Sequence, residues 1–299
     1  MPQRANGAKN LSELTKEEKD FIVKTYFEKT MTIAQMTKHF NLTSRTMPAL
    51  LKEYNISSKR KNRYTLNERY FATIDTERKA YWLGYLYADG FVGDEKHNNI
   101  VFLQKNTDGY AVEQFASDIN FDGVIRTTKN VGGFAGELQK VINFSSKVMA
   151  DDLRELKMET RKSMTMTDLP PIPSELMRHF IRGYFDGDGS ISRSVRHRYK
   201  NGRLNYKYLA CMIGTEPFLR KIADLLPCQS HFVDSHTPEM KYLYVWNKAY
   251  MEPMFHYLYD DASFCLVRKY NIWLQILGDL GVKASEEKRD KPDKGCPTT

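Results

Sequence analysis

Two short segments of this chain repeat nearly the same pattern about a hundred residues apart. The first copy reads Leu83-Gly84-Tyr85-Leu86-Tyr87-Ala88-Asp89-Gly90, and the second reads Ile181-Arg182-Gly183-Tyr184-Phe185-Asp186-Gly187-Asp188-Gly189. Each copy is an apolar, helix-like run that ends in Asp-Gly. A repeat at this distance predicts two half-domains that face each other across a pseudo-two-fold axis. One chain would then carry both halves of a single paired-carboxylate site.

Small residues recur four positions apart in both copies, as Gly84 with Ala88 and as Gly183 with Gly187. This spacing puts each pair on one face of a helix, where two backbones can approach closely. Glycine inside a helix costs ~1 kcal/mol relative to alanine, so its use in both copies indicates tight helix-to-helix packing. We expect Ser174 to cap the second helix.

An acid closes each copy, Asp89 in the first and Asp188 in the second. A helix dipole disfavours negative charge at a C-terminus by ~0.3–1 kcal/mol, and two neighbouring acids also repel each other. A bound divalent cation removes both penalties, and carboxylates with nearby carbonyls suit Mg²⁺. Asp-Gly is also a common turn dipeptide, so a single copy would more often be structural.

The segments after the two copies are similar as well. After the first copy we expect a strand over 99–104, a helix over 110–119 and two strands within 123–144. After the second we expect a hairpin with an Asn201-Gly202 turn and a strand ending at Ile213, then a helix over 217–226 and strands within 232–245. The predicted fold class is α+β, with two pseudo-symmetric αββαββα half-domains and antiparallel sheets, preceded by a small all-α domain.

Basic residues are concentrated near the N-terminus. The net charge is +8; residues 1–72 hold 14 Lys and Arg against 7 Asp and Glu, and the other 227 residues hold 31 against 30. This excess is expected of an N-terminal module that binds a polyanion. A solvated basic tail is the alternative.

Three bursts of apolar residues at helical spacing, within 21–26, 33–40 and 47–54, predict three helices in this module. Thr15 and Glu18 form a capping-box pattern at the start of the first. Together the helices indicate a helix-turn-helix unit, and a three-helix bundle without a DNA role is the alternative.

The third helix, opened by Thr43 or Ser44, would present Ser44, Arg45 and Thr46 to a major groove. Pro48 fits if this helix starts near Thr46, because proline is tolerated only in the first turn of a helix.

Two further stretches are rich in cations. A linker carries Lys59, Arg60, Lys61 and Arg63. Residues 190–215 contain no acid and carry Arg193, Arg196, Arg198, Lys200, Arg203 and Lys207, with Tyr199, Tyr206 and Tyr208 between them. A cationic two-stranded ribbon can reach phosphates and base edges in a major groove, so we favour DNA contact over a solvated hairpin. For the linker, phosphate contact and a solvated charge run are equally compatible with the sequence.

Matching basic pairs follow the two halves, Arg161-Lys162 and Arg268-Lys269. A lysine beside the carboxylates could stabilise charge on a phosphate or help to activate a nucleophile. The alternative is that both pairs are ordinary surface charge. Their recurrence at equivalent places in the two halves makes this interpretation less favourable.

The four cysteines are scattered and show neither a C-x-x-C pair nor His partners at zinc-ligand spacing. The N-terminus lacks an apolar signal segment, and no stretch is apolar enough to span a membrane. We therefore expect reduced thiols, no membrane partner and a cytoplasmic protein.

These motifs resemble the LAGLIDADG homing endonucleases in their monomeric, two-motif form. The run from His179 to Ile191 is a highly specific match, and the first copy is a weaker one; the resemblance extends from Asn67 to Leu280. The N-terminal helix-turn-helix is similar to versions carried by phages and bacterial mobile introns, which implies a bacterial or phage-infected cell and association with the nucleoid through DNA. The resemblance also implies a monomer in which two four-stranded saddles hold double-stranded DNA. Both strands would be cut across the minor groove to leave short 3′ overhangs, with Mg²⁺ as the cofactor and Mn²⁺ as a substitute.

The resemblance also implies roles for individual residues. The metal ligands would be Asp89 and Asp188, with the carbonyls of Ala88 and Gly187. Lys162 and Lys269 match the active-site lysines of the family, and Gln104 and Lys105 are candidates for positioning water. The two motif helices would pack through Gly84, Ala88, Gly183 and Gly187.

Tyr87 departs from the family pattern, because it stands where the second copy has Asp186 and where the family often has an acid. That position supports the helix end, so the departure weakens the symmetry of the site and could favour nicking. The alternatives to an endonuclease are a catalytically silent DNA-binding regulator or an RNA-binding intron maturase on the same scaffold, or a structural helix-turn-helix adaptor. The first two would be expected to lose the acids or the lysines, and the third leaves the repeated acids unexplained.

The expected domains are a helix-turn-helix domain over 1–56, a basic linker over 57–67, a first repeat over 68–172, a second repeat over 173–282 and a disordered tail over 283–299. The tail combines high charge and two prolines with no apolar periodicity.

Overall fold

A computed structural model describes residues 7–28, 31, 33–56, 64–129, 136–158, 160 and 162–282. The chain forms two compact units, residues 1–65 and 66–299, which are described separately. The linker cations Lys59, Arg60, Lys61 and Arg63, together with Arg161 and the tail over 283–299, lie outside the described residues. Among the helices of the described part, none is long and apolar enough to cross a membrane.

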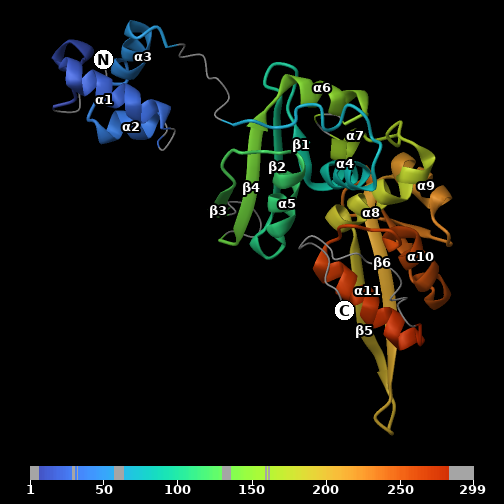
Figure 1. Cartoon of the computed structure of the whole chain (residues 1–299). Helices are drawn as coiled ribbons and strands as arrows, with labels where there is room; N and C mark the ends of the chain where they lie inside the picture. Colours follow the sequence, from blue (N-terminus) through green and yellow to red (C-terminus); the bar gives the residue numbers. More distant parts are fainter. Residues whose placement is uncertain are drawn as a thin grey trace. The chain divides into compact units, whose positions relative to one another are not determined.

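The first unit is helical (Figure 1). It contains a 3₁₀ turn η1 (Leu11–Glu13) and the helices α1 (Lys16–Phe27), α2 (Ile33–His39) and α3 (Thr46–Glu53). The predicted capping box is confirmed, since the Thr15 side chain accepts from the Glu18 amide and Glu18 accepts from the Thr15 amide. The core of the unit is formed by Ile22, Met36, Met47 and Leu50, all at most 2% exposed.

Helix α3 begins at Thr46, later than Thr43 or Ser44, the predicted starts. Pro48 therefore lies in the first turn, where its missing N–H leaves no hydrogen bond unmade. The N-terminal segment stabilises the preceding turn, because the Lys9 amide donates to the Asn41 carbonyl and the Thr43 amide donates to the Lys9 carbonyl. The turn thus has a fixed backbone in front of the helix.

The second unit contains two halves of the same design (Figure 1). The first half has α4 (Glu77–Asp89), β1 (Gly90–Val92), β2 (Asn99–Lys105), η2 (Asn106–Asp108), α5 (Tyr110–Asp118), β3 (Arg126–Lys129), β4 (Leu138–Ser145), α6 (Lys147–Glu155) and α7 (Lys162–Thr165). The second has η3 (Ser174–Leu176), α8 (Met177–Asp188), β5 (Ser190–Arg198), β6 (Leu204–Thr215), α9 (Glu216–Leu225), β7 (His231–Asp234), β8 (Met240–Val245), η4 (Lys248–Tyr250), α10 (Met251–Tyr259) and α11 (Val267–Leu280).

Each half forms a four-stranded antiparallel sheet, in the order β1-β2-β4-β3 and β5-β6-β8-β7. The two orders are identical when equivalent strands are compared, so the predicted α+β fold with two αββαββα halves is confirmed. The last helix of each half is divided in two, as α6 with α7 and α10 with α11. One face of each sheet is buried under helices: Ile100 and Phe102 are fully buried in the first, and Met212 and Leu243 are 1% exposed in the second.

Helices α4 and α8 pack against each other along the centre of the unit (Figure 1). A Cβ atom added to Gly84 would lie 1.9 Å from the Phe180 carbonyl oxygen, and one added to Gly183 would lie 2.0 Å from the Tyr81 carbonyl oxygen. The two backbones are therefore in direct contact at these glycines. Large apolar side chains fill the space on either side.

The start of α8 differs from the prediction. Ser174 opens the 3₁₀ turn η3, its hydroxyl contacts Glu175, and α8 follows from Met177 without a side-chain cap. Proline at 173 and the 3₁₀ turn already turn the chain into the helix, so Ser174 does not cap it.

A buried cation is fixed at the N-terminal end of the two central helices. Arg182 is fully buried and pairs with Glu77 of α4. Its guanidinium also donates to the Leu258 carbonyl at 3.1 Å and lies over the Tyr81 ring. Because Glu77 and Tyr81 belong to α4 and Leu258 belongs to α10, the network fixes α8 against both helices.

Acid is expected to destabilise this unit through His179. Its buried ring accepts a hydrogen bond from Arg182 at 2.6 Å, and burial followed by the charge of Arg182 lowers the pKa of His179 to about 3. The unfolded chain binds a proton near pH 6.5 and the folded chain does not. The stabilisation is thus complete above pH 6.5 and falls by about 1.4 kcal/mol for each pH unit as the pH drops toward 3.

Urea unfolding followed by tryptophan fluorescence measures this effect, because all three tryptophans lie in the second unit. Between pH 8 and pH 5, the stability of a His179→Asn variant should fall less with decreasing pH than that of the wild-type chain. His97→Asn is the matched control, since the His97 side chain is 65% exposed. Equal slopes in wild type and His179→Asn would contradict the prediction.

Candidate active site and nucleic-acid interface

The two motif acids lie together at the C-terminal ends of α4 and α8. A Cβ atom added to Gly187 would lie 2.2 Å from the Ala88 Cβ, which shows that the two helix ends touch one residue before each acid. Burial raises the pKa of Asp89, against the hydrogen bond from Gln104. Burial and the charge of Asp89 raise the pKa of Asp188 to about 6. The pair therefore holds negative charge in a poorly solvated place.

Gln104 completes the first half of this site. Its side chain is buried, and its Nε2 donates to the Asp89 Oδ2 at 2.7 Å. Lys105 does not join it, which corrects the prediction that made both residues candidates for positioning water. Successive residues of a strand point to opposite faces, so Lys105 lies on the solvent-facing side of the sheet, where it pairs with Glu137 at 3.4 Å.

The second half has no side chain equivalent to Gln104. Gly90 pairs with Phe102 in the first sheet, two residues before Gln104. In the second motif the residue equivalent to Gly90 is Gly189. Because Ser190 pairs with Cys211, Gly189 lies opposite Met212, and the position two residues further along β6 is Gly214. A Cβ atom at Gly214 would lie 2.8 Å from the Tyr184 hydroxyl, which already occupies this space. The site is thus asymmetric around its two acids.

Both predicted lysines reach the motif helices and are buried there. Lys162 Nζ donates to the Ala88 carbonyl at 2.6 Å. Lys269 Nζ donates to the carbonyls of Phe185 and Asp186 at 2.7 Å, and to that of Gly187 at 3.3 Å. The lysines thus bond carbonyls in the last turn of each motif helix and oppose the helix dipole.

Desolvation acts on these two ammonium groups as it does on the acids. Burial lowers the pKa of Lys162, opposed by the charges of Asp188 and Asp89. Burial likewise lowers the pKa of Lys269 to about 8. Two acids and two lysines thus form one electrostatically coupled cluster, assembled from α4, α8, α7 and α11.

The residue two positions before the end of each motif helix fixes a lysine-bearing segment. Asp186 is buried and accepts from the Leu266 amide at 2.8 Å and the Tyr259 hydroxyl at 2.9 Å. Leu266 immediately precedes α11. Tyr87, which stands at the equivalent position, donates its hydroxyl to the Leu156 carbonyl, on the chain that leads to α7. Tyrosine therefore performs the same anchoring in the first half.

The donor set of the cluster consists of oxygen atoms. In the described part of the chain no group of three or more His, Cys, Asp and Glu side chains is placed to hold a metal ion. The available ligands are the two carboxylates and the carbonyls of Ala88 and Gly187. Hard divalent cations such as Mg²⁺ bind through one or two carboxylates and retain several waters, so these residues fit that class of ion.

The β5–β6 hairpin extends well beyond the rest of its half (Figure 1). The predicted Asn201-Gly202 turn is confirmed, with Gly202 at φ +82°. Five predicted DNA-binding cations are exposed along this hairpin: Arg196, Arg198, Lys200, Arg203 and Lys207. Arg193 does not belong with them, which corrects the prediction. It lies on the helix-packed face, where it pairs with Asp279 of α11 at 2.6 and 2.8 Å and covers the Tyr206 ring.

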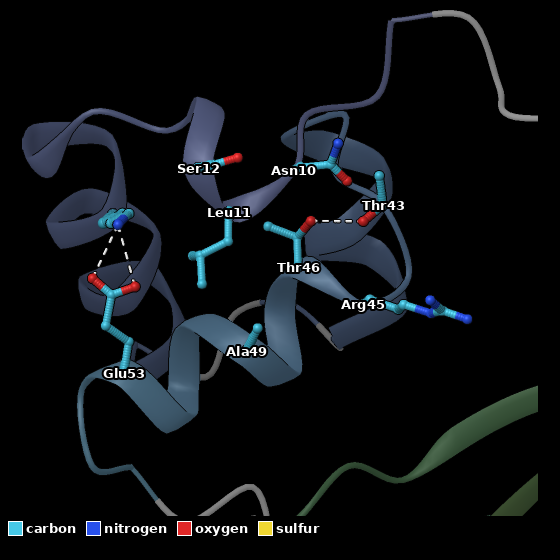
Figure 2. Close-up of a pocket in the computed structure, with 9 residues that line it drawn as sticks. Asn10, Leu11, Ser12, Thr43, Arg45, Thr46, Ala49 and Glu53 are labelled. Atoms are coloured by element: carbon cyan, nitrogen blue, oxygen red, sulfur yellow. Dashed lines mark hydrogen bonds and ion pairs between the residues drawn. The ribbon is translucent and has the colours of Figure 1, made fainter.

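In the first unit, a groove of about 500 Å³ runs between η1 and α3 (Figure 2). Ser44 and Arg45 are exposed at the start of α3, and Arg45 lines the groove. Thr46 is 2% exposed and its hydroxyl donates to the Lys9 carbonyl, so it stabilises the turn and cannot reach a base. The prediction for Thr46 is thus corrected.

Two sets of residues at these surfaces were missed by sequence reasoning. Asn10 and Ser12 line the groove beside α3, but the short η1 segment has no periodic pattern to reveal it. A row of aromatic rings occupies the solvent-facing side of the second sheet, and the alternation Tyr242-x-Tyr244-x-Trp246 is the sequence signal that could have found it.

The LAGLIDADG-like domain family matches residues 175–226, which cover α8 and the strands and helix that follow it. The family resemblance predicted from the second motif is thereby confirmed over these residues. No curated protein matches the chain in sequence.

The chain is also similar to solved structures at low sequence identity. The meganuclease I-SmaMI bound to uncleavable DNA aligns with 66% of this chain and 88% of its own, with 11% identity and a TM-score of 0.45. I-SmaMI bound to cleaved DNA aligns with 69% and 89%, with 12% identity and a TM-score of 0.45. The LAGLIDADG meganuclease I-AabMI bound to uncleaved DNA aligns with 67% and 90%, with 8% identity and a TM-score of 0.48.

Proposed function

We propose that this protein is a site-specific endonuclease that hydrolyses phosphodiester bonds in both strands of a DNA duplex. The observation that carries the proposal is the cluster of Asp89, Asp188, Lys162 and Lys269 at the joined ends of α4 and α8. Two acids whose pKa values are raised by burial are costly to the fold, and their recurrence with a lysine in both halves indicates a shared chemical task. One chain supplies both halves, so the active form is a monomer.

A divalent cation, Mg²⁺ with Mn²⁺ as a substitute, is part of this proposal. Asp89 and Asp188 would hold it, with the carbonyls of Ala88 and Gly187 as further oxygen donors. When bound, it neutralises the acids and stabilises the negative charge that develops on the phosphate.

The protein's own residues have separate parts in the reaction. Gln104 holds the Asp89 carboxylate by a hydrogen bond of 2.7 Å, which fixes the orientation of that carboxylate. Lys162 and Lys269 supply positive charge where the phosphate gains negative charge. Water adds to phosphorus as the bond to the 3′ oxygen breaks; one proton of the water ends on that oxygen, and the products are a 3′ hydroxyl and a 5′ phosphate.

Binding of the duplex is assigned to the exposed side of each sheet and to the first unit. The exposed cations of the β5–β6 hairpin would contact phosphates, and Ser44 and Arg45 would add contacts in a major groove. With the two acids at the junction of the halves, we propose that the strands are cut across the minor groove, leaving short 3′ overhangs. Because Gly214 occupies the position equivalent to Gln104, the two halves of the site differ, and the two DNA strands would be cut at unequal rates.

Purified protein and a random-sequence DNA library test the proposal directly. With Mg²⁺, sequencing of the cut ends should return one long motif with a fixed offset between the strands, and a chelator should abolish the cuts. Tight binding to a defined DNA sequence without cuts would replace the proposal by a silent regulator. Preference for structured RNA over any duplex DNA would replace it by a maturase.

A further inference from the structure

The second sheet carries an aromatic row on its solvent-facing side, formed by His231, Tyr242, Tyr244 and Trp246. Strand alternation places Tyr242 and Tyr244 opposite the buried Leu243 and Val245, and so on the side away from the helices. The register pairs His231 with Tyr244. Trp246 is 44% exposed. Exposed aromatic clusters of this kind mark interaction sites.

Neighbouring rings of the row contact one another. His231 and Trp246 stack with centroids 4.1 Å apart and planes 5° apart. Tyr244 lies 6.2 Å from Trp246 and 5.5 Å from Tyr242, with planes 39° and 30° apart. The stack of His231 on Trp246 covers one face of each ring, which leaves fewer aromatic faces on which an unstacked base could lie. This geometry favours a duplex over single-stranded nucleic acid, which binds by stacking.

The surroundings of the row match a duplex as well. Lys207 lies on the same side of the sheet, since it shares the alternation of Leu209 and Cys211, and Cys211 pairs with Tyr244. The exposed cations of the β5–β6 hairpin continue from this strand. An apolar row beside cations is complementary to a DNA groove, in which phosphates line the edges and the base edges at the bottom carry apolar groups. In the major groove the apolar group is the C5 methyl of thymine.

We propose that the row of His231, Tyr242, Tyr244 and Trp246 reads thymine methyl groups in the half-site bound by the second sheet. This inference rests on the proposed function, because it assigns sequence preference within the same duplex. The first sheet offers a more polar surface at comparable positions, where Lys105, Gln139 and Arg126 alternate with Leu103 and Val141. That side of the first sheet also exposes Phe91 (42%) and Leu103 (36%), but its described residues form no comparable row of rings. Recognition by an aromatic row is therefore assigned to one half of the target.

Replacing thymine by uracil tests the proposal, because it removes the methyl group and keeps base pairing. Binding selection in Ca²⁺ should first return a site with thymines grouped in one half. Each uracil substitution in that group should weaken wild-type binding about 3- to 5-fold, as expected for one buried methyl group. Uracil in the other half should have no comparable effect.

Two variants link the methyl effect to the row. Trp246→Ser should lose the uracil sensitivity and the thymine preference while it still binds DNA. Leu225→Ser is the matched control, because Leu225 is a 41% exposed apolar residue on α9, on the helix-covered side of the same sheet. This control should keep the wild-type profile.

The possible failures are distinct. A defined site with no thymine group, or with equal uracil sensitivity in wild type and Trp246→Ser, overturns the inference and leaves the proposed function intact. Absence of any preferred duplex overturns both. Tight binding of single-stranded oligothymidine or oligouridine that Trp246→Ser abolishes would replace methyl reading by base stacking.

Discussion

Asp188→Asn should abolish DNA cleavage and leave the fold and DNA binding intact. Asparagine keeps the size of the side chain but removes the charge, so the oxygen donors for a divalent cation lose half of their negative charge. We expect cleavage of both strands to fall by about 10³-fold or more, the scale of losing one main transition-state contact. Asp89→Asn should behave in the same way, since the two acids occupy equivalent helix ends.

Stability gives this experiment a second readout. Asp188 is partly buried beside Asp89, and both the burial and that charge raise its pKa. In chelator at neutral pH, Asp188→Asn removes one of two repelling charges and should unfold at a urea concentration no lower than the wild type. Asp224→Asn makes the same chemical change on the exposed side of α9 and should alter neither property. Full cleavage by Asp188→Asn would refute the assignment of the site.

The central architecture could be predicted because its signals are local and occur twice. Gly84 and Gly183 each break helix propensity inside an apolar run, which only close helix packing explains. Asp89 and Asp188 then follow from the spacing of the motif. Lys162 and Lys269 could be assigned because they follow the two motifs at matching positions, and equivalent segments of a repeat occupy equivalent places in the fold.

Other contacts depend on partners that the local sequence does not reveal. Arg193 belongs to a cationic run, but it pairs with Asp279, 86 residues later, because strand alternation turns it toward α11. Lys105 and Gln104 are neighbours in sequence, and only the sheet register decides which one meets Asp89. Thr46 lies in a segment whose composition is typical of a recognition helix, but its hydroxyl donates to the Lys9 carbonyl and stabilises the turn. Each error concerns which face a side chain occupies.

Substitution of the central glycines should have the largest effect on stability. In Gly84→Ala and in Gly183→Ala, the added methyl group would overlap a backbone carbonyl of the facing helix, at 1.9 Å and 2.0 Å. Backbone atoms at the centre of two packed helices cannot rotate away as a side chain can, so α4 and α8 must separate. We expect each variant to lose about 3 kcal/mol or more of unfolding free energy, at or above the upper range for overpacking.

Gly278→Ala provides the matched control for this prediction. Gly278 also lies inside a helix, α11, but a Cβ atom there would have nothing within 4 Å. The same substitution should therefore stabilise the chain by up to about 1 kcal/mol through helix propensity alone. Urea unfolding followed by tryptophan fluorescence measures both effects. Opposite signs at Gly84 and Gly278 would show that backbone contact between the motif helices requires glycine, whereas a stabilised Gly84→Ala would contradict that contact. Because Asp89 and Asp188 end these same helices, any separation large enough to admit a methyl group should also disperse the carboxylates and reduce cleavage.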